Sequence, residues 1–242
     1  MTGPTSTDRE GERAAGAPSA AGTVSERIHE RLRADILGGR YGAGDPLPSE
    51  RRLSEEFQTN RHAVREALKR LQQAGLVSIS QGGATRVRDW RRHGGLELLL
   101  DVAAQGDAPE ALKAPRAAME MRASIGADAA RLCSRRASDA LRAELRARAE
   151  QLSALDDLDA RGAQYEVLWD LIVEGADNIA YRLALTTLVA RQRVAPVSGE
   201  AVAQEIEDDK AIGALVTAIT DGGPDAAHAA ARHLLERSIP NA

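Results

Sequence analysis

The sequence predicts a mainly α-helical chain with one short β-hairpin in its N-terminal third. Only 6 of the 242 residues are aromatic, so the core must consist of Ala, Leu, Ile and Val, a composition that favours helices over a β-sandwich. Apolar residues recur at helical spacing along most of the chain. Strict alternation of apolar and polar residues occurs between residues 77 and 88, which predicts the hairpin.

Three helices are predicted before the hairpin. An apolar residue at every fourth position over 24–36 predicts the first helix, which a glycine pair ends. Ser49 is a suitable N-cap for a short second helix that carries Leu53 inward. Asn60 offers the cap of a third helix, which Gly75 closes and whose buried face comprises Val64, Ala67, Leu68, Leu71 and Ala74.

The predicted hairpin follows the three predicted helices directly. Val77 and Ile79 alternate with serines, Thr85 and Val87 alternate with arginines, and a glycine-containing turn over 81–84 separates the two runs. Three helices and a hairpin within about 65 residues are the plan of a winged helix-turn-helix. We therefore expect a winged helix-turn-helix domain over 23–90, preceded by a disordered tail over 1–22.

The charge is distributed unevenly. The whole chain carries a formal net charge of −4, but residues 24–92 hold 14 basic against 9 acidic side chains. Residues 93–242 hold 16 basic against 24 acidic side chains. A basic N-terminal part attached to an acidic remainder indicates that only the former meets a polyanion, although surface scatter gives the same balance.

The third helix offers a face suited to DNA. In a helix-turn-helix the second helix of the pair enters the major groove, and arginine reads guanine through two hydrogen bonds. An exposed helix face with no partner is the alternative. The candidates for DNA contact are Arg61, His62, Arg65, Lys69 and Gln72 on the third helix, Arg51 and Arg52 on the second, and Gln81, Gly82 and Arg86 in the wing.

Residues at fixed spacings strengthen this interpretation: Leu47-Pro48-Ser49-Glu50-Arg51-x-Leu53, Asn60-Arg61-x-x-Val64-Arg65-Glu66-Ala67-Leu68-x-x-Leu71, and Gly75-Leu76-Val77. With them, residues 24–90 resemble the DNA-binding domain of the GntR family of bacterial transcription regulators. The family more often has Val-Ser where this chain has Thr59-Asn60. The resemblance implies DNA contacts by Arg51, Arg61 and Arg65, and operator reading and wing insertion by His62, Gln81 and Gly82.

The remainder is predicted to be an all-helical bundle of six or seven helices over 95–240. Ser138, Asn178 and Ser198 are expected N-caps, and Pro224 is suited to a first helical turn. The predicted helices cover 96–104, 117–136, a segment from 139 bearing Leu141, Leu145 and Leu152, 165–175, 179–193, 199 to about 220, and a last helix from 224.

This bundle resembles the FCD effector domain of the FadR branch, on the residues Arg122-x-x-Ile125, Ala129-Ala130-x-Leu132, Arg136-Ala137-Ser138 and Leu168-Trp169 through Asn178. Many FCD domains hold a divalent metal through one Asp and three His. Here the Asp position falls at Tyr165, the first His at Trp169 and the second near Ile212, and one imidazole, that of His233, is no metal site. We therefore expect no metal and no other cofactor.

The resemblance instead suggests a pocket for an organic effector. Tyr165 and Trp169 are one helical turn apart and are expected to line an apolar wall, with His233 nearby. Arg122 is the anchor that the resemblance suggests for an anionic group of the ligand. The alternatives are that the two aromatic side chains only pack the bundle and that Arg122 is a salt-bridged or surface arginine.

Together these features predict a ligand-responsive transcription regulator, a repressor or an activator. It is expected to bind a palindromic operator in double-stranded DNA as a homodimer. The effector is expected to be a small organic acid or acyl compound. A DNA-binding protein whose helical domain only dimerises is the alternative, and a thermal-shift screen with ligands separates the two.

Other classes of protein are disfavoured. The sequence shows no usable Ser-His-Asp arrangement, no phosphate-binding glycine loop and no group of metal ligands, so an enzyme is not expected. Cys133 is the single cysteine, which excludes an internal disulfide and a Cys-based zinc finger, and it lies on an apolar stripe. Because neither a membrane span nor a signal peptide is apparent, a cytoplasmic protein without membrane contact is predicted.

Overall fold

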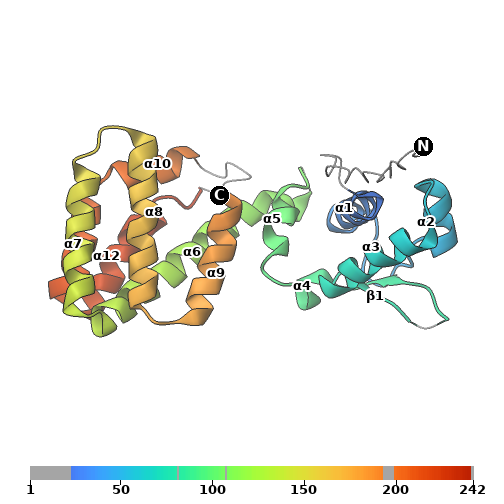
Figure 1. Ribbon diagram of the computed structural model, residues 1–242, viewed down its shortest axis with the longest axis horizontal. Helices are drawn as coiled ribbons and strands as arrows, with labels where there is room; N and C mark the ends of the chain where they lie inside the picture. The colour runs from blue at the N-terminus through green and yellow to red at the C-terminus, as the bar shows by residue number, and fades with distance from the viewer. Residues whose placement is uncertain (1–22, 81, 107, 193–198, 241–242) are drawn as a thin grey trace, which may run out of the picture.

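The computed structural model describes residues 23–80, 82–106, 108–192 and 199–240, so the tail expected over 1–22 lies outside the described residues. The fold is mainly helical, as predicted, with an N-terminal lobe and a C-terminal lobe at the two ends of the molecule (Figure 1). The elements are α1 Val24–Leu37, α2 Glu50–Glu56, α3 Arg61–Gln73, β1 Val77–Ser78, β2 Arg86–Val87, α4 Trp90–His93, α5 Leu98–Ala103, α6 Pro109–Arg136, α7 Asp139–Ser153, α8 Leu158–Gly175, α9 Ile179–Gln192, α10 Gly199–Glu207, α11 Asp209–Thr217, the π-helical turn η1 Ala218–Gly222, and α12 Pro224–Glu236.

Side-chain caps fix where the first three helices begin. Thr23 and Glu26 form a reciprocal capping box at the start of α1. The Ser49 hydroxyl accepts from the backbone N–H of Arg52 at 3.3 Å, and the Asn60 side chain accepts from that of Ala63 at 3.0 Å. The predicted caps of α2 and α3 are therefore confirmed, and α3 packs against both α1 and α2.

The predicted hairpin is confirmed as a small two-stranded antiparallel sheet that pairs Val77 with Val87. The loop before α2 runs along the outer side of β2. The backbone N–H of Leu47 donates to the carbonyl of Thr85 at 2.8 Å, and that of Val87 donates to the carbonyl of Asp45 at 2.9 Å. These bonds hold the wing against the rest of the lobe, because a two-stranded hairpin alone is marginally stable in water.

Gly75 fixes the junction between α3 and the wing. Its φ is +74°, and a Cβ at this position would lie 2.1 Å from the His93 carbonyl oxygen. We expect Gly75→Ala to lower the free energy of unfolding by about 2 kcal/mol or more, since both the left-handed backbone and a backbone clash oppose it.

Gly82 provides the matched control for this prediction. Its φ is +76°, but nothing lies within 4 Å of a Cβ added there, so Gly82→Ala should cost only the backbone term of about 1 kcal/mol. Urea denaturation followed by tryptophan fluorescence measures both variants. Equal losses for the two would show that the contact with His93 is unimportant.

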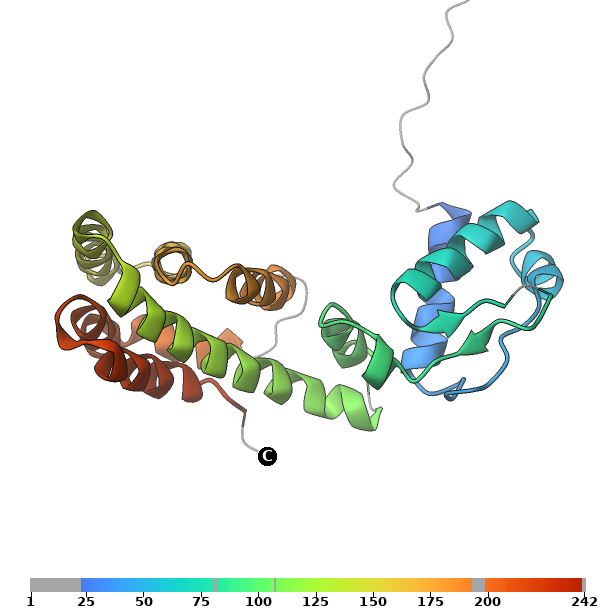
Figure 2. The ribbon, with the colours of Figure 1, turned by 90° about the horizontal axis from the view of Figure 1, so that it is seen from below.

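Two helices connect the lobes. The buried side chains Leu98 and Val102 of α5 belong to the core of the N-terminal lobe, and Asp101 forms an ion pair with Arg33 of α1 at 3.1 Å. α6 begins eight residues before the predicted 117, because Pro109 is accepted in a first helical turn. It therefore extends from Ala114, in the N-terminal core, to the core of the C-terminal lobe (Figure 2).

The C-terminal lobe is a bundle in which α6 packs against α8 and α12, with α7 and α11 completing the core. The expected cap at Ser138 is confirmed by its bond from the Leu141 N–H at 3.2 Å, and the Asn178 side chain accepts from Ala180 at 3.0 Å. Pro224 begins α12 as predicted. The helix predicted over 165–175 begins earlier, at Leu158, where Asp157 caps it.

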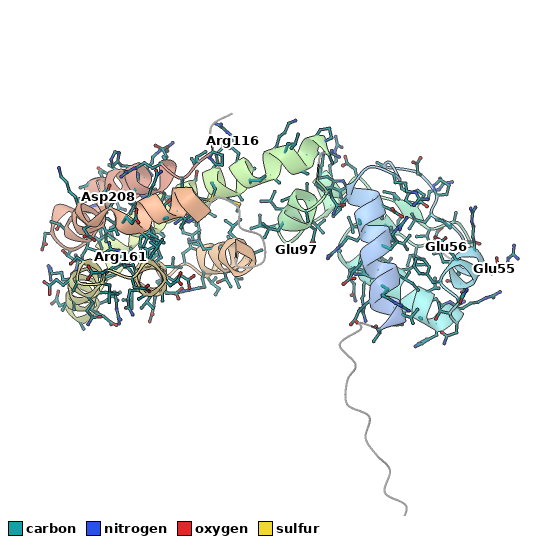
Figure 3. All side chains as sticks on the ribbon, turned by 90° about the horizontal axis from the view of Figure 1, so that it is seen from above. Glu55, Glu56, Glu97, Arg116, Arg161 and Asp208 are labelled. Carbon is teal, nitrogen blue, oxygen red and sulfur yellow. The ribbon has the colours of Figure 1, made fainter. Side chains whose placement is uncertain are left out.

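The single helix predicted from 199 to about 220 is wrong, because the segment divides at Asp208 and ends in the π-helical turn. Asp208 caps α11 by accepting from Ala211 at 2.9 Å. The buried Arg161 of α8 donates to the Ile206 carbonyl at 2.8 Å and so satisfies the end of α10. Arg161 and Asp208 both lie in the C-terminal lobe of Figure 3. The predicted cap at Ser198 lies outside the described residues.

Among the described ranges, no helix is long and apolar enough to cross a membrane. Cys133 is fully buried in the C-terminal core, and this burial raises the pKa of its thiol to about 11. The thiol is therefore protonated and unreactive near neutral pH. This environment is that of a packing residue rather than of a nucleophile.

Candidate functional site

The outer face of α3 carries three exposed cations at helical spacing. Arg61, Arg65 and Lys69 all lie on the solvent side, together with Gln72, while Val64, Leu68 and Leu71 face the core. The exposed His62 stands beside Arg61 in the first turn. α2 and α3 together form the helix-turn-helix, with α2 at the end of the N-terminal lobe that is remote from the bundle and α3 running from there toward α4 (Figure 1).

Most of these cations have an intramolecular partner. Arg65 of α3 pairs with Glu50 of α2 at 2.9 Å, Arg51 pairs with Glu55 at 3.1 Å, and Lys69 pairs with Glu66 at 2.9 Å. Figure 3 shows Glu55 at the end of the N-terminal lobe that is remote from the bundle. Exposed pairs of this kind contribute little to stability. Their cations therefore remain available to a phosphate or a base.

Arg61 differs from its neighbours on α3. Among the described residues it has no ion pair or side-chain hydrogen bond, and it occupies the first turn of the helix. The peptide dipoles add a partial positive charge at a helix N-terminus. Arg61 can therefore contact DNA without breaking an ion pair to a described residue.

Of the two residues expected to contact DNA at the tip of the wing, the structure describes Gly82. Gly82 is exposed at a φ of +76°, whereas Gln81 lies outside the described residues. Arg86 donates to the Gly44 carbonyl at 2.9 Å and so helps to hold the wing in place. Arg52 is exposed on α2, as its expected contact with the phosphate backbone requires.

The C-terminal lobe contains a cavity of about 410 Å³ between α6, α8, α9, α10 and α12. This volume lies within the usual range of small-molecule sites. Tyr165 and Trp169 both line it, in an edge-to-face arrangement with ring centroids 6.3 Å apart. Arg122 lines it as well, but His233 is exposed on α12 and is not among the lining residues. Aliphatic side chains complete the wall, including Val173, Leu185, Val202, Ile206 and Leu235.

Arg122 is engaged by a carboxylate that the sequence prediction missed. Its two terminal nitrogens donate to the two oxygens of Glu205 at 2.8 and 2.7 Å, and the Glu205 side chain is fully buried. The Tyr165 hydroxyl donates to the same carboxylate at 2.9 Å, and the Ser238 hydroxyl is also hydrogen-bonded to it. Glu205 therefore joins α6, α8 and the segment after α12 to α10.

The charges in this buried group stabilise one another. Burial works against the charged guanidinium of Arg122, but the hydrogen bonds and the charge of Glu205 outweigh it and raise the pKa of Arg122. Burial and the neighbouring Glu205 charge raise the pKa of the Tyr165 hydroxyl. At neutral pH the tyrosine is therefore a neutral donor beside an intact ion pair. The salt-bridged alternative for Arg122 is the one that the structure contains.

One signal in the sequence points to Glu205. It stands three residues after Val202 and next to Ile206, on the apolar face of α10. A carboxylate on an apolar helix face is expected to have a buried cationic partner. The identity of that partner, 83 residues earlier in the chain, could not be derived from spacing.

A second ion pair lies at the mouth of the cavity. Arg182 of α9 donates to Asp170 of α8 at 2.8 Å. The Asp170 side chain is 75% exposed, in contrast to the fully buried Glu205. Both arginines described in the cavity wall thus have a carboxylate partner.

The residues at the positions that correspond to the metal ligands of many FCD domains do not fit a metal ion. The Tyr165 hydroxyl is bound to Glu205, the Trp169 indole can only donate, and Ile212 is a buried core residue. Within the part of the chain that the structure describes, no three His, Cys, Asp or Glu side chains converge to hold a metal ion.

Comparisons with known proteins identify both lobes. Residues 24–87 match the model of the bacterial regulatory proteins of the gntR family, and residues 117–237 match that of the FCD domain. The chain belongs to the GntR family and carries an FCD domain. This GntR regulator is a DNA-binding transcriptional regulator and not an enzyme, in agreement with the sequence prediction.

Individual relatives support the assignment. The HTH-type transcriptional regulator Mce2R of Mycobacterium tuberculosis is 36% identical over 88% of this chain and 89% of its own length. The transcriptional repressor NanR of Cronobacter sakazakii is 44% identical, but over only 29% of this chain and 27% of its own length. A solved structure of Lar from Listeria monocytogenes, described as controlling expression of the agr system, shares the fold with a TM-score of 0.53 at 17% identity, covering 91% of this chain and 97% of its own.

Proposed function

We propose that this GntR regulator binds a palindromic operator as a homodimer and that a small acyl compound in the FCD cavity controls its affinity for DNA. One winged helix covers too few base pairs for useful specificity, whereas two half-sites related by two-fold symmetry double the readout. Repression is the expected sign of regulation, because the NanR proteins, which the DNA-binding segment resembles, are named repressors.

The observation that carries the proposal is that one helix, α6, belongs to the cores of both lobes. α6 contributes Ala114 to the core of the N-terminal lobe and contributes Arg122 and Gly126 to the wall of the cavity. A ligand that binds one pose of α6 better than another therefore shifts the pose of the DNA-binding lobe by its differential affinity. An ion pair between Arg91 of α4 and Glu110 of α6, at 3.0 Å, also connects the end of the N-terminal lobe to α6.

The cavity favours this regulator over a DNA-binding protein whose helical domain only dimerises. A lobe that serves only as a dimerisation module needs a packed core but no cavity. Here about 410 Å³ remains open between five helices, with polar groups at defined positions in an otherwise apolar wall. This combination is typical of small-molecule sites.

Selection of binding sequences from a random duplex library tests the operator and the assembly together. The full-length chain should enrich an inverted repeat, and mass photometry or sedimentation should show two chains on one duplex. Enrichment of a single, non-repeated half-site bound by one chain would contradict the proposal.

A further inference from the structure

The charge of the effector follows from the groups that surround the cavity. The resemblance to FCD domains suggested Arg122 as an anchor for an anion, but both terminal nitrogens of Arg122 donate to the carboxylate of Glu205. Arg122 is only 8% exposed, and the Glu205 side chain is fully buried. The pair therefore presents no net positive charge to the cavity.

The remaining charges of the described wall do not attract an anion either. Arg182 is paired with Asp170 at the mouth, and the further lining carboxylate, Glu166, is negative. The described wall therefore has two arginines, Arg122 and Arg182, and two carboxylates, Glu166 and Asp170. The buried Glu205, which is bonded to Arg122, is a third carboxylate. An anionic ligand would have to leave water and meet a wall whose described residues include no cation without a carboxylate partner, which is unfavourable.

We infer that Glu205 determines the specificity of this cavity, because it neutralises Arg122 and so makes the site select uncharged acyl compounds, such as amides or esters, over carboxylates. The inference rests on the proposed function, in which the cavity holds the effector. Aliphatic and aromatic side chains receive the hydrocarbon part of such a ligand. Its neutral polar head needs hydrogen bonds but no counter-ion.

Near-isosteric pairs of a charged acid and its neutral amide test the inference directly. Octanoate and octanamide, cyclohexanecarboxylate and cyclohexanecarboxamide, and phenylacetate and phenylacetamide are near-isosteric pairs, and each acid is ionised at pH 8. Calorimetric titration of the full-length chain at pH 8 should show at least tenfold tighter binding of the amide in the pairs that bind. An acid that binds as tightly as its amide, or more tightly, overturns the inference.

The variant Glu205→Ala reverses the selection. It leaves Arg122 without its counter-ion and opens space beside both guanidinium nitrogens, so the affinity for the acid relative to its amide should rise at least tenfold. Glu205→Gln, which keeps the size of the side chain, provides the same test if the alanine variant does not fold. An unchanged ratio of acid to amide affinity in a folded variant contradicts the role assigned to Glu205.

Two control variants isolate the cause. Asp170→Ala also removes the partner of a wall arginine, but at a solvent-exposed pair, so the acid-to-amide ratio should change less than threefold. The double variant Arg122→Met with Glu205→Met has no charge at the buried position and should keep the wild-type preference for amides. An equally large gain of acid binding in either control overturns the inference.

These outcomes also separate the inference from the proposed function. If the wild-type chain binds acids more tightly than their amides, the inference is contradicted but the proposed function is not, because the cavity is then still a ligand site. If neither member of any pair binds the wild-type chain or the variants, the cavity is not the effector site, and both the proposed function and the inference fail.

Discussion

Replacing Arg122 by Ala is expected to destabilise the C-terminal lobe by about 3–5 kcal/mol. The substitution leaves the Glu205 carboxylate fully buried with only the Tyr165 and Ser238 hydroxyls as neutral donors. An uncompensated buried charge costs far more than the lost pair contributed. Urea denaturation of the full-length chain, followed by far-UV circular dichroism, measures the change.

The control for this prediction removes both charges. Because a buried ion pair can be replaced by apolar side chains at little cost, Arg122→Met with Glu205→Met should recover most of the loss caused by Arg122→Ala. Exposed pairs provide the opposite comparison, since Asp170→Ala should change stability by less than about 1 kcal/mol. A loss of less than about 1 kcal/mol for Arg122→Ala would show that Glu205 reaches solvent.

Replacing Arg61 by Ala is expected to weaken operator binding by about 1–3 kcal/mol, or roughly 5- to 150-fold. Arg61 is exposed in the first turn of α3 and has no ion pair among the described residues, so its removal breaks no intramolecular contact. Fluorescence anisotropy with the selected operator measures the affinity, and thermal unfolding should be unchanged.

The salt dependence of the same titration shows what Arg61 contacts. If it reads a base, discrimination among operator variants falls at one position; if it contacts phosphate, binding weakens evenly and the salt dependence becomes shallower by about one charge. Arg135→Ala, an exposed arginine at the end of α6, is the matched control and should leave DNA binding unchanged. Equal effects of the two substitutions would show that α3 is not the contact surface.

Local signals in the sequence were sufficient for the first three helices and the wing of the N-terminal lobe, although not for the addition of α5 to its core. Ser49 and Asn60 cap helices through their own first turns, and the alternation around Val77 and Val87 sets the register of the wing. These interactions join residues that are close in sequence or belong to one hairpin. The periodicity of apolar residues, the N-cap residues and the turn residues therefore predict these interactions.

The interactions that escaped prediction are long-range. Arg161 of α8 donates to the Ile206 carbonyl near the end of α10, just before the break at Asp208, and the charge of the cavity depends on the pairing of Arg122 with Glu205. Helical periodicity shows that a position is buried but does not show which buried groups meet. The role of Arg122 as an anchor for an anionic group was suggested by the resemblance to FCD domains, and the sequence did not show that Glu205 is its partner.

Operator affinity measured with and without a bound cavity ligand tests the central claim most directly. The amide from the matched pairs that binds the full-length chain most tightly is added at saturation to an anisotropy titration of the selected operator. We predict that the dissociation constant for DNA changes by at least fivefold, which corresponds to a coupling free energy of about 1 kcal/mol, and that the operator changes the affinity for the amide by the same factor. Saturation of the cavity with no change in operator affinity would contradict the account.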